Sequence, residues 1–501
     1  MQGFTVVDLV ILVVYLAAVL FAGLHFSKKE MKGKEYFKGD GTVPWWVTSV
    51  SIFATLLSPI SFLSLAGNSY AGTWIMWFAQ LGMLLAIPLT IRFFLPIYSR
   101  LDIDTAYHYL ELRFGSKGLR VLGAVMFIIY QVGRMSIIMY LPCMVLGSLT
   151  GISVNLLIII MGVIAIIYSY TGGLKSVLWT DFIQGSVLLI GVTFSLIFLL
   201  VHIDGGIGSI FAAFAAEHKF LAEDQPVFDI NILRDSVFIM IVGAGFNTMG
   251  SYVSSQDIVQ RFTTTTDQKK LNKMMLANGA LSIFIATVFY LIGTGLYVFY
   301  RQNALPPAAA QDQIFASYIA FELPVGVTGL LLAAIYAASQ STLSTGLNSV
   351  AASWTLDIQA RLAKKELSFE TQTKIGQYVS LIVGIFSIAV SMVLANGGVK
   401  SAYEWFNGFM GLVLGILIGT FILGAFTKTA NTFGAVLAFI AASLVMVGIK
   451  YFVPAEAVSI WSYSLISIGV SLAVGIPASL ISRKIKGDDS VPAPGTTIYG
   501  R

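Results

Sequence analysis

The chain has 501 residues, of which 57% are hydrophobic and only 11% are charged, and its mean hydropathy is +0.83. Soluble globular proteins carry about 25% charged residues, so this composition indicates a helical protein that crosses a membrane several times. The single cysteine, Cys143, excludes an internal disulfide, and the four histidines lack metal-ligand spacing. The net charge of +5 is modest, so we expect no nucleic-acid partner. The sequence contains no GxxxxGK[ST] phosphate loop, so we do not expect direct use of ATP.

About 13 apolar segments are long enough to span a bilayer. They cover residues 4–26, 46–68, 72–97, 121–149, 154–171, 177–202, 235–256, 275–299, 324–353, 375–395, 402–426, 431–452 and 458–482. Most Lys and Arg residues fall in loops of one parity, after the first, third, seventh, ninth and last segments. The positive-inside rule then predicts an external N-terminus and a cytoplasmic C-terminus in the plasma membrane.

The second segment is predicted to be broken. It contains the sequence FATLLSPIS, residues Phe53–Ser61, with Pro59 near its middle. Proline removes a backbone donor and clashes one turn back, which frees carbonyl groups near Thr55. Broken backbone at membrane depth is tolerated only where it is buried in protein or lines a cavity. The alternative is an ordinary kink in a helical bundle.

Two charged residues are predicted to lie within the membrane, Arg134 in the fourth segment and Asp181 near one end of the sixth. A centred Arg costs about 2.5–3.5 kcal/mol on insertion scales and needs a partner. One interpretation is that the two residues pair with each other, although we expect them at different depths. Alternatively, Asp181 neutralises a bound cation, and Arg134 offers its planar fork to a carboxylate. Gln80 in the third segment is either a further polar contact or an interhelical hydrogen bond.

The seventh segment is also predicted to be broken, because Gly243–Tyr252 (GAGFNTMGSY) contains three glycines and Asn247. It lies five segments after the first break, and an odd offset reverses the direction of crossing. Residues 46–202 and 235–426 are therefore predicted to be inverted repeats. Such repeats indicate a secondary transporter with a site near the middle of the membrane. One N-terminal and two C-terminal segments would lie outside the repeats.

The ninth segment is unusually rich in hydroxyl groups. Its stretch IYAASQSTLSTGLNS carries Ser339, Ser341, Thr342, Ser344 and Thr345. Positions 341, 344 and 345 share one helix face. Neutral oxygens without an imidazole or thiolate suit a hard cation such as Na⁺. The alternative is that these hydroxyls bind a neighbouring helix.

The stretch YTGGLKSVLWTDFIQ, residues Tyr170–Gln184, resembles the signature of the sodium/solute symporter family, GGxxxVxxTDxxQ. The hydroxyl-rich ninth segment and the FATLLSPISF break match the same family, and the resemblance covers essentially the whole chain. It implies the LeuT-type fold, an all-α bundle with a 5+5 inverted repeat that works by alternating access. Within the family, FATLLS, Gln80 and Gly133–Arg134 are similar to the bacterial sialic acid (N-acetylneuraminate) transporters.

The resemblance also implies specific ligands. The common sodium site would use the carbonyls of Ala54, Leu57 and Ser341 and the side chains of Ser344 and Thr345. A second sodium site would use Asp181, Ser341, Thr342, Ser344 and Thr345. The substrate carboxylate would meet Arg134, and the remaining substrate-binding candidates are Ser58, Ser61, Gln80 and Asn247. In one departure, Leu56 stands where the sialic acid pattern has a hydroxyl residue, and Pro59 follows Ser58, which would alter affinity or the sialic acid variant accepted.

We therefore expect a monomeric symporter in a lipid bilayer, with Na⁺ as the coupling ion and a small anionic sugar acid as the substrate. Proline, pantothenate, another monocarboxylate and a sugar are alternative substrates, and an ion channel is the alternative class. Paired carboxylates, histidine clusters and a nucleophile elbow are missing at membrane depth, so we expect no enzyme. Residues 1–486 are predicted to form one transporter domain, and residues 487–501 a disordered cytoplasmic tail.

Overall fold

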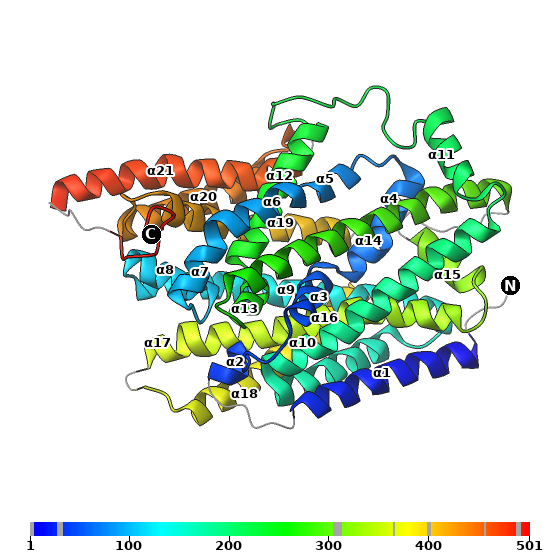
Figure 1. Ribbon diagram of the computed structural model, residues 1–501, viewed down its shortest axis with the longest axis horizontal. Helices are drawn as coiled ribbons and strands as arrows, with labels where there is room; N and C mark the ends of the chain where they lie inside the picture. The colour runs from blue at the N-terminus through cyan, green and yellow to red at the C-terminus, as the bar shows by residue number, and fades with distance from the viewer. Residues whose placement is uncertain are drawn as a thin grey trace.

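The computed structural model describes residues 5–27, 34–303, 313–363, 366–397, 402–454, 457–486 and 492–500. Within these residues every regular element is a helix, as predicted (Figure 1). The long helices are α1 (Val6–Ser27), α9 (Lys117–Thr150), α10 (Val154–His202), α12 (Val237–Ser254), α14 (Gln268–Gln302), α16 (Val327–Ala352), α18 (Phe369–Asn396), α19 (Ala402–Phe426), α20 (Thr432–Phe452) and α21 (Tyr463–Lys486). The shorter helices are α2 (Lys34–Lys38), α3 (Trp45–Leu56), α4 (Pro59–Ala71), α5 (Trp77–Leu81), α6 (Met83–Leu89), η1 (Thr90–Phe94), α7 (Leu95–Leu101), α8 (Ala106–Phe114), α11 (Gly206–Ala216), α13 (Gln256–Phe262), α15 (Ile314–Phe321), η3 (Ser353–Gln359), α17 (Ala360–Leu362) and η5 (Ile460–Ser462).

Ten helical stretches of the described residues are long and apolar enough to cross a membrane, and the bent pair α3–α4 raises this number to 11. Two shorter apolar helices, Val154–Ile167 and Leu414–Phe426, lie within the predicted segments 154–171 and 402–426. The chain is therefore an integral membrane protein with many spans. The count of about 13 stays a prediction.

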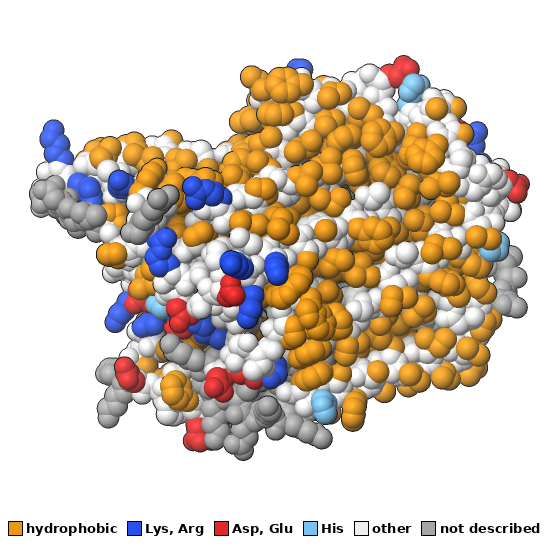
Figure 2. All heavy atoms as spheres, viewed as in Figure 1, with side chains coloured by type: hydrophobic (Ala, Val, Ile, Leu, Met, Phe, Trp, Pro, Cys, Tyr) orange, Lys and Arg blue, Asp and Glu red, His pale blue; other side chains and the backbone are white. Residues whose placement is uncertain are grey.

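Apolar and charged side chains are distributed over the surface as a bilayer requires. Exposed apolar side chains include Val14 and Phe21 of α1 and Ile190 and Ile197 of α10. Hydrophobic atoms cover most of the face in Figure 2, whereas Lys and Arg gather toward the end that carries α7 and α8 in Figure 1. An apolar belt with charges at its ends fits a helical bundle in lipid.

Helix α16 lies at the centre of the bundle. Every residue from Leu331 to Ala352 is buried, including Ser339, Ser341, Thr342, Ser344 and Thr345. The helix packs against α1, α3, α9, α10 and α18. Because no side of this stretch faces lipid, its hydroxyl groups can only meet other protein groups or a bound ligand.

The second predicted break is placed wrongly. Helix α12 runs without interruption through Gly243–Tyr252, and the break comes at Ser255, whose backbone is extended between α12 and α13. The glycines instead permit close packing. A Cβ atom on Gly243 would lie 2.1 Å from the carbonyl oxygen of Trp461, and one on Gly245 would lie 3.0 Å from that of Gly82. Glycine weakens an isolated helix, but here tight packing outweighs that local cost.

The junction between the fifth and sixth predicted segments is a sharp kink inside α10. Gly173, in the GG of the sequence signature, has φ +55° and ψ −160°, a conformation that is essentially restricted to glycine. A Cβ atom there would lie 2.6 Å from the carbonyl oxygen of Tyr36. The signature glycine therefore serves both the backbone turn and the close approach of α2.

Residues 492–500 lie against α8 and α19. The N–H of Ile498 donates to the carbonyl of Ala425 at 3.1 Å, and the hydroxyl of Tyr109 donates to the carbonyl of Thr496 at 3.0 Å. The predicted disorder of the tail is wrong for these residues, because their backbone groups find partners beside the end of α19. Residues 487–491 and 501 lie outside the described residues.

We predict that Gly173→Ala lowers stability by about 1–3 kcal/mol, because alanine is strained in this conformation and its Cβ would meet the Tyr36 carbonyl. Gly448→Ala in α20 is the matched control, since an added Cβ there meets nothing within 4 Å. The measurement is the apparent Tm of both variants in mild detergent. Equal Tm values would contradict the role assigned to the kink.

Candidate functional site

The candidate site lies where the break between α3 and α4 meets α16, beside α9, α10 and α13. Leu57 and Ser58 have extended backbones, with ψ of 114° and 160°. The hydroxyl of Ser58 accepts the N–H of Ser61 at 3.2 Å and so caps α4, while Pro59 begins α4. The axes of the two helices differ by 64°. The predicted break is confirmed, and Pro59 stands at the start of a helix, where its missing N–H costs nothing.

Four of the five residues predicted for the common sodium site belong to one polar network. The hydroxyl of Ser341 donates to the carbonyl of Ala54 at 3.1 Å, and the hydroxyl of Ser344 donates to the carbonyl of Ser341 at 3.1 Å. The hydroxyl of Thr345 lies 3.3 Å from that of Thr55. Leu57, the fifth residue, is at the break. These uncharged oxygens from α3 and α16 suit a hard monovalent cation.

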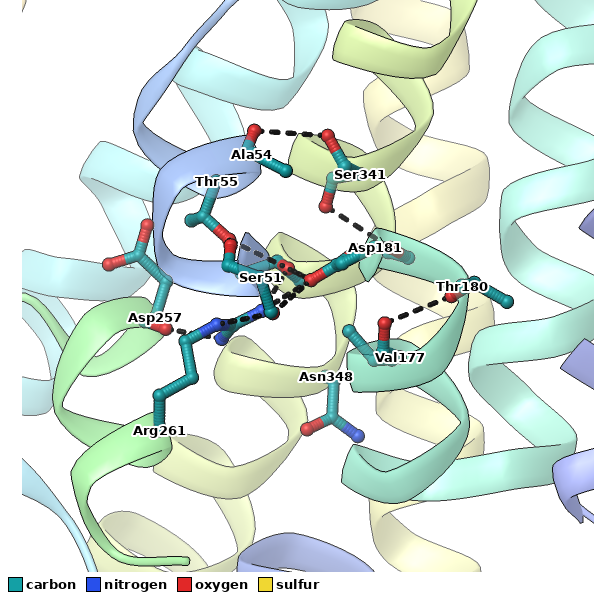
Figure 3. A network of polar contacts seen from close by, with 12 residues as sticks. Ser51, Ala54, Thr55, Val177, Thr180, Asp181, Asp257, Arg261, Ser341 and Asn348 are labelled. Atoms are coloured by element: carbon teal, nitrogen blue, oxygen red, sulfur yellow. Dashed lines mark hydrogen bonds and ion pairs between the residues drawn. The ribbon is translucent and has the colours of Figure 1, made fainter. Parts of the chain in front are cut away.

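Asp181 of α10 is fully buried beside this network (Figure 3). Its Oδ2 accepts hydrogen bonds from Ser51 at 2.6 Å and from Thr345 at 3.1 Å, and its Oδ1 accepts one from Ser344 at 3.4 Å. Thr342, also predicted for the second sodium site, instead donates to the carbonyl of Ala338 within α16. The structure therefore brings Asp181 to Ser344 and Thr345 but shows no hydrogen bond from Thr342 to it.

Arg134 of α9 is buried and lies at the α3–α4 break. Its Nη2 donates to the carbonyl of Thr55 at 2.7 Å, and its Nη1 forms an ion pair with Asp257 of α13 at 2.6 Å. The alternative that Arg134 pairs with Asp181 is wrong. In this structure the guanidinium of Arg134 already contacts the carboxylate of Asp257, and its contact with a substrate carboxylate stays a prediction.

Asp181 likewise has a charged partner on α13. Nη2 of Arg261 lies 2.8 Å from Oδ2 of Asp181, and Nε of Arg261 donates to the hydroxyl of Ser51 at 2.9 Å. Asp257 and Arg261 fall after the predicted end of the seventh segment, in a loop that was predicted to be basic and cytoplasmic. The signal that could have found them is an Asp–Arg pair one turn apart around the apolar residues Ile258 and Val259.

The other predicted substrate contacts are distributed over four helices, α3, α4, α5 and α12. The hydroxyls of Ser58 and Ser61 lie 3.2 Å apart at the start of α4, and half-buried Leu56 ends α3. Gln80 is half-buried on α5, which packs against α12. Asn247 of α12 is exposed and accepts a hydrogen bond from Ser464 of α21 at 3.1 Å. Its amide oxygen therefore already has a partner on α21.

Gln131 is a further polar residue that the motifs do not indicate. It is fully buried on α9, three positions before Arg134, and neither of its amide atoms has a hydrogen-bond partner among the described residues. A Cβ atom on Gly346 would lie 2.6 Å from its Nε2, so the amide abuts α16 one residue beyond Thr345. An unpartnered amide in this position is suited to meet a polar ligand.

A broken helix, a buried hydroxyl-rich helix and paired intramembrane charges define a membrane protein with an oxygen-lined candidate cation site and a buried ionic centre. The sodium:solute symporter family matches residues 36–442, and the chain belongs to that family. This match confirms the family resemblance of the signature at Tyr170–Gln184.

Relatives of known activity extend the comparison over nearly the whole chain. The sodium/sialic acid symporter SiaT of Proteus mirabilis is 33% identical over 98% of this chain and 99% of its own length. The sodium/sialic acid symporter NanT of Aliivibrio fischeri is 30% identical over 97% of this chain and 96% of its own. A solved Na⁺-coupled sialic acid symporter, substrate-bound and outward-open, superimposes with a TM-score of 0.87 over 96% of this chain and 98% of its own, at 33% identity.

We predict strong energetic coupling between Arg134 and Asp257. Removing either partner leaves a buried unpaired charge, so Arg134→Gln or Asp257→Asn alone should cost about 3–5 kcal/mol. The double variant should cost less than the sum of the two by about 1–3 kcal/mol. The measurement is equilibrium unfolding in mixed detergent micelles.

The exposed pair Arg301–Glu217 provides the control cycle, with Arg301→Gln and Glu217→Gln. Coupling between exposed ion pairs is typically about 0–1 kcal/mol. If both cycles gave the same small coupling, the ion pair between α9 and α13 would not be a stabilising contact in the protein.

Proposed function

We propose that this chain is a sodium-coupled symporter that imports sialic acid, N-acetylneuraminate, by alternating access. The observation that carries the proposal is the near full-length similarity to two sodium/sialic acid symporters, combined with a buried Arg134 at the α3–α4 break. An anionic sugar acid needs a cationic group in the pocket, and a guanidinium binds a carboxylate through two parallel hydrogen bonds.

Sodium would bind at two places on α16. The common site would use the carbonyls of Ala54, Leu57 and Ser341 with the hydroxyls of Ser344 and Thr345. The second site would use Asp181 with Ser341, Thr342, Ser344 and Thr345. The proposal is supported by the contacts that join α3, α10 and α16 through these oxygens. A sodium ion there would hold the two broken halves of the second span to α16.

Energetics favour a second sodium ion. A tenfold sodium gradient supplies about 1.4 kcal/mol, and a potential of about 100 mV, negative inside, adds about 2.3 kcal/mol per charge. A single sodium ion that carries a monoanion retains about 1.4 kcal/mol, which allows about tenfold accumulation. Two sodium ions retain about 5 kcal/mol, which allows accumulation of several thousandfold.

In the substrate site, Arg134 would meet the carboxylate, and Ser58, Ser61 and Gln80 would meet the carboxylate end and the sugar hydroxyls. Leu56 would line the same pocket and favour a sialic acid variant with less polar contact at that position. Asn247 remains a further candidate, although its amide oxygen already accepts a hydrogen bond from Ser464. Ligand binding in each state would shift the population between outward- and inward-open forms.

The finer architecture belongs to the same proposal. Residues 1–486 would form one transporter domain of about 13 helices, with inverted repeats at approximately 46–202 and 235–426. Helices α1, α20 and α21 would lie outside the repeats. The N-terminus would be external and the C-terminus cytoplasmic, which fits the basic end of the molecule in Figure 2. The transporter would act as a monomer.

The test is uptake of labelled N-acetylneuraminate into proteoliposomes. We expect saturable uptake that requires an inward sodium gradient and increases when the interior is made negative. Uptake blocked by excess proline would indicate an amino-acid carrier instead. Flux without saturation would indicate a channel, and uptake that follows a proton gradient without sodium would indicate proton coupling.

We predict that Asp181→Asn weakens accumulation more than it weakens substrate binding, because the carboxylate offsets the charge of the second sodium ion. The measurement compares steady-state accumulation with equilibrium binding at saturating sodium. Asp224→Asn, at an exposed acidic residue, is the control and should change neither quantity. Equal losses of accumulation and binding for Asp181→Asn would argue against a sodium-specific role.

A further inference from the structure

The short helix α13 contributes charge to both halves of the candidate site. All seven of its residues are buried, including Asp257 and Arg261, which lie one helical turn apart. Asp257 pairs with Arg134 of α9. Arg261 pairs with Asp181 of α10, as Figure 3 shows. Nη1 of Arg261 also donates to the backbone carbonyl of Asp257. Two ion pairs of opposite polarity therefore share one helix.

The guanidinium of Arg261 occupies a position suited to a cation. It contacts Oδ2 of Asp181 at 2.8 Å and the hydroxyl of Ser51 at 2.9 Å, and it also donates to the hydroxyl of Thr345. Two of these oxygen donors, from Asp181 and Thr345, are those proposed for the second sodium ion. A sodium ion that binds them must therefore displace Arg261 or share them with it.

The carboxylate of Asp257 occupies the position at Arg134 that is proposed for the substrate carboxylate. Its Oδ2 lies 2.6 Å from Nη1 of Arg134, and its Oδ1 accepts a hydrogen bond from Ser255 at the break between α12 and α13. A substrate carboxylate that binds Arg134 would meet a fork already held by a carboxylate. The substrate must displace Asp257 or compete with it.

We infer that Asp257 and Arg261 are built-in counter-ions, which take the places of the substrate carboxylate and the second sodium ion when both ligands are absent. This inference rests on the proposed function, since it assumes an anionic substrate at Arg134 and sodium at Asp181. It assigns to α13 a positioning role in coupling, which none of the sequence motifs indicates.

Charge balance gives the physical reason for coupling. Arg134, Asp181, Asp257 and Arg261 together carry no net charge, and all four are at most 5% exposed. The second sodium ion alone would leave one excess positive charge in this group of four residues, and the substrate anion alone would leave one negative charge. Uncompensated buried charge is strongly unfavourable, whereas the two ligands together restore neutrality. Each ligand therefore increases the affinity for the other, as linkage requires.

The same exchange would loosen α13. Helix α13 begins after the extended residue Ser255, and its charged contacts tie it to α9 and α10. When the ligands replace those contacts, the helix loses both ion pairs at once. Removal of only one contact leaves the other in place, so movement of α13 would require both ligands.

The experiment measures ligand coupling in the purified full-length protein in detergent. Its readout is the N-acetylneuraminate concentration that gives half-maximal thermal stabilisation, in sodium and in an equal concentration of potassium. For the wild type we expect sodium to lower this concentration at least tenfold. Arg261→Met gives the group one excess negative charge, so half-maximal stabilisation by sodium without substrate should need at least tenfold less sodium.

Asp257→Asn tests the opposite charge. It leaves one excess positive charge, so N-acetylneuraminate should stabilise the protein in potassium almost as well as in sodium. The double variant Asp257→Asn/Arg261→Met is neutral again and should recover at least part of the sodium effect. A merely structural role would not favour sodium in one variant and the substrate anion in the other, or restore the sodium effect in the double variant.

Gln260→Met is the matched control, because Gln260 is a buried neighbour on α13 that bonds Asn348 and the carbonyl of Phe37. It should keep the wild-type sodium effect. Arg261→Lys keeps the charge and should stay within about threefold of the wild type. If Arg261→Met does not fold, Asp257→Asn alone decides.

The experiment distinguishes failure of the proposed function from failure of the inference about α13. If neither sodium nor N-acetylneuraminate stabilises the wild type, the proposed function fails. If the wild type shows the sodium effect and both single variants retain it unchanged, the inference about α13 is overturned while the proposed function stands.

Discussion

Charges buried among these helices are stable only when they are paired, and this constraint determines how the centre of the bundle is assembled. Arg134, Asp181, Asp257 and Arg261 lie on three helices, and each would be expensive alone in an apolar interior. Their two ion pairs bring α9, α10 and α13 together beside α16. A transporter can use the same constraint, because a ligand charge enters such a site readily only when another charge balances it.

The broken backbone adds a second constraint. Between α3 and α4 the chain is extended at Leu57 and Ser58, so carbonyl groups near the break are not all used by helical hydrogen bonds. The structure satisfies two of them with side chains, the carbonyl of Ala54 with Ser341 and that of Thr55 with Arg134. The break is thus attached both to the hydroxyl-rich helix and to the buried arginine. The affinity for sodium and the affinity for substrate would both depend on these few residues.

Local sequence was most informative where a single residue determines the conformation of its own backbone. Pro59 predicted a break that the structure has, and the GG of the signature lies at the kink that requires Gly173. The glycine run Gly243–Tyr252 misled for a related reason. Glycine permits a broken helix and also permits close helix packing, and only the neighbouring Trp461 and Gly82 decide between them.

By itself the sequence determined the membrane class, the approximate spans, the family and the hydroxyl-rich face of the ninth segment. These depend on hydrophobicity, helical period and local motifs, which are written along the chain. Only the tertiary structure decided that Arg134 pairs with Asp257 and Asp181 with Arg261, and that residues 492–500 lie against α19. Ion-pair partners far apart in sequence follow from helix placement, and local patterns do not contain that placement. The counter-ions of the site are therefore a property of the fold.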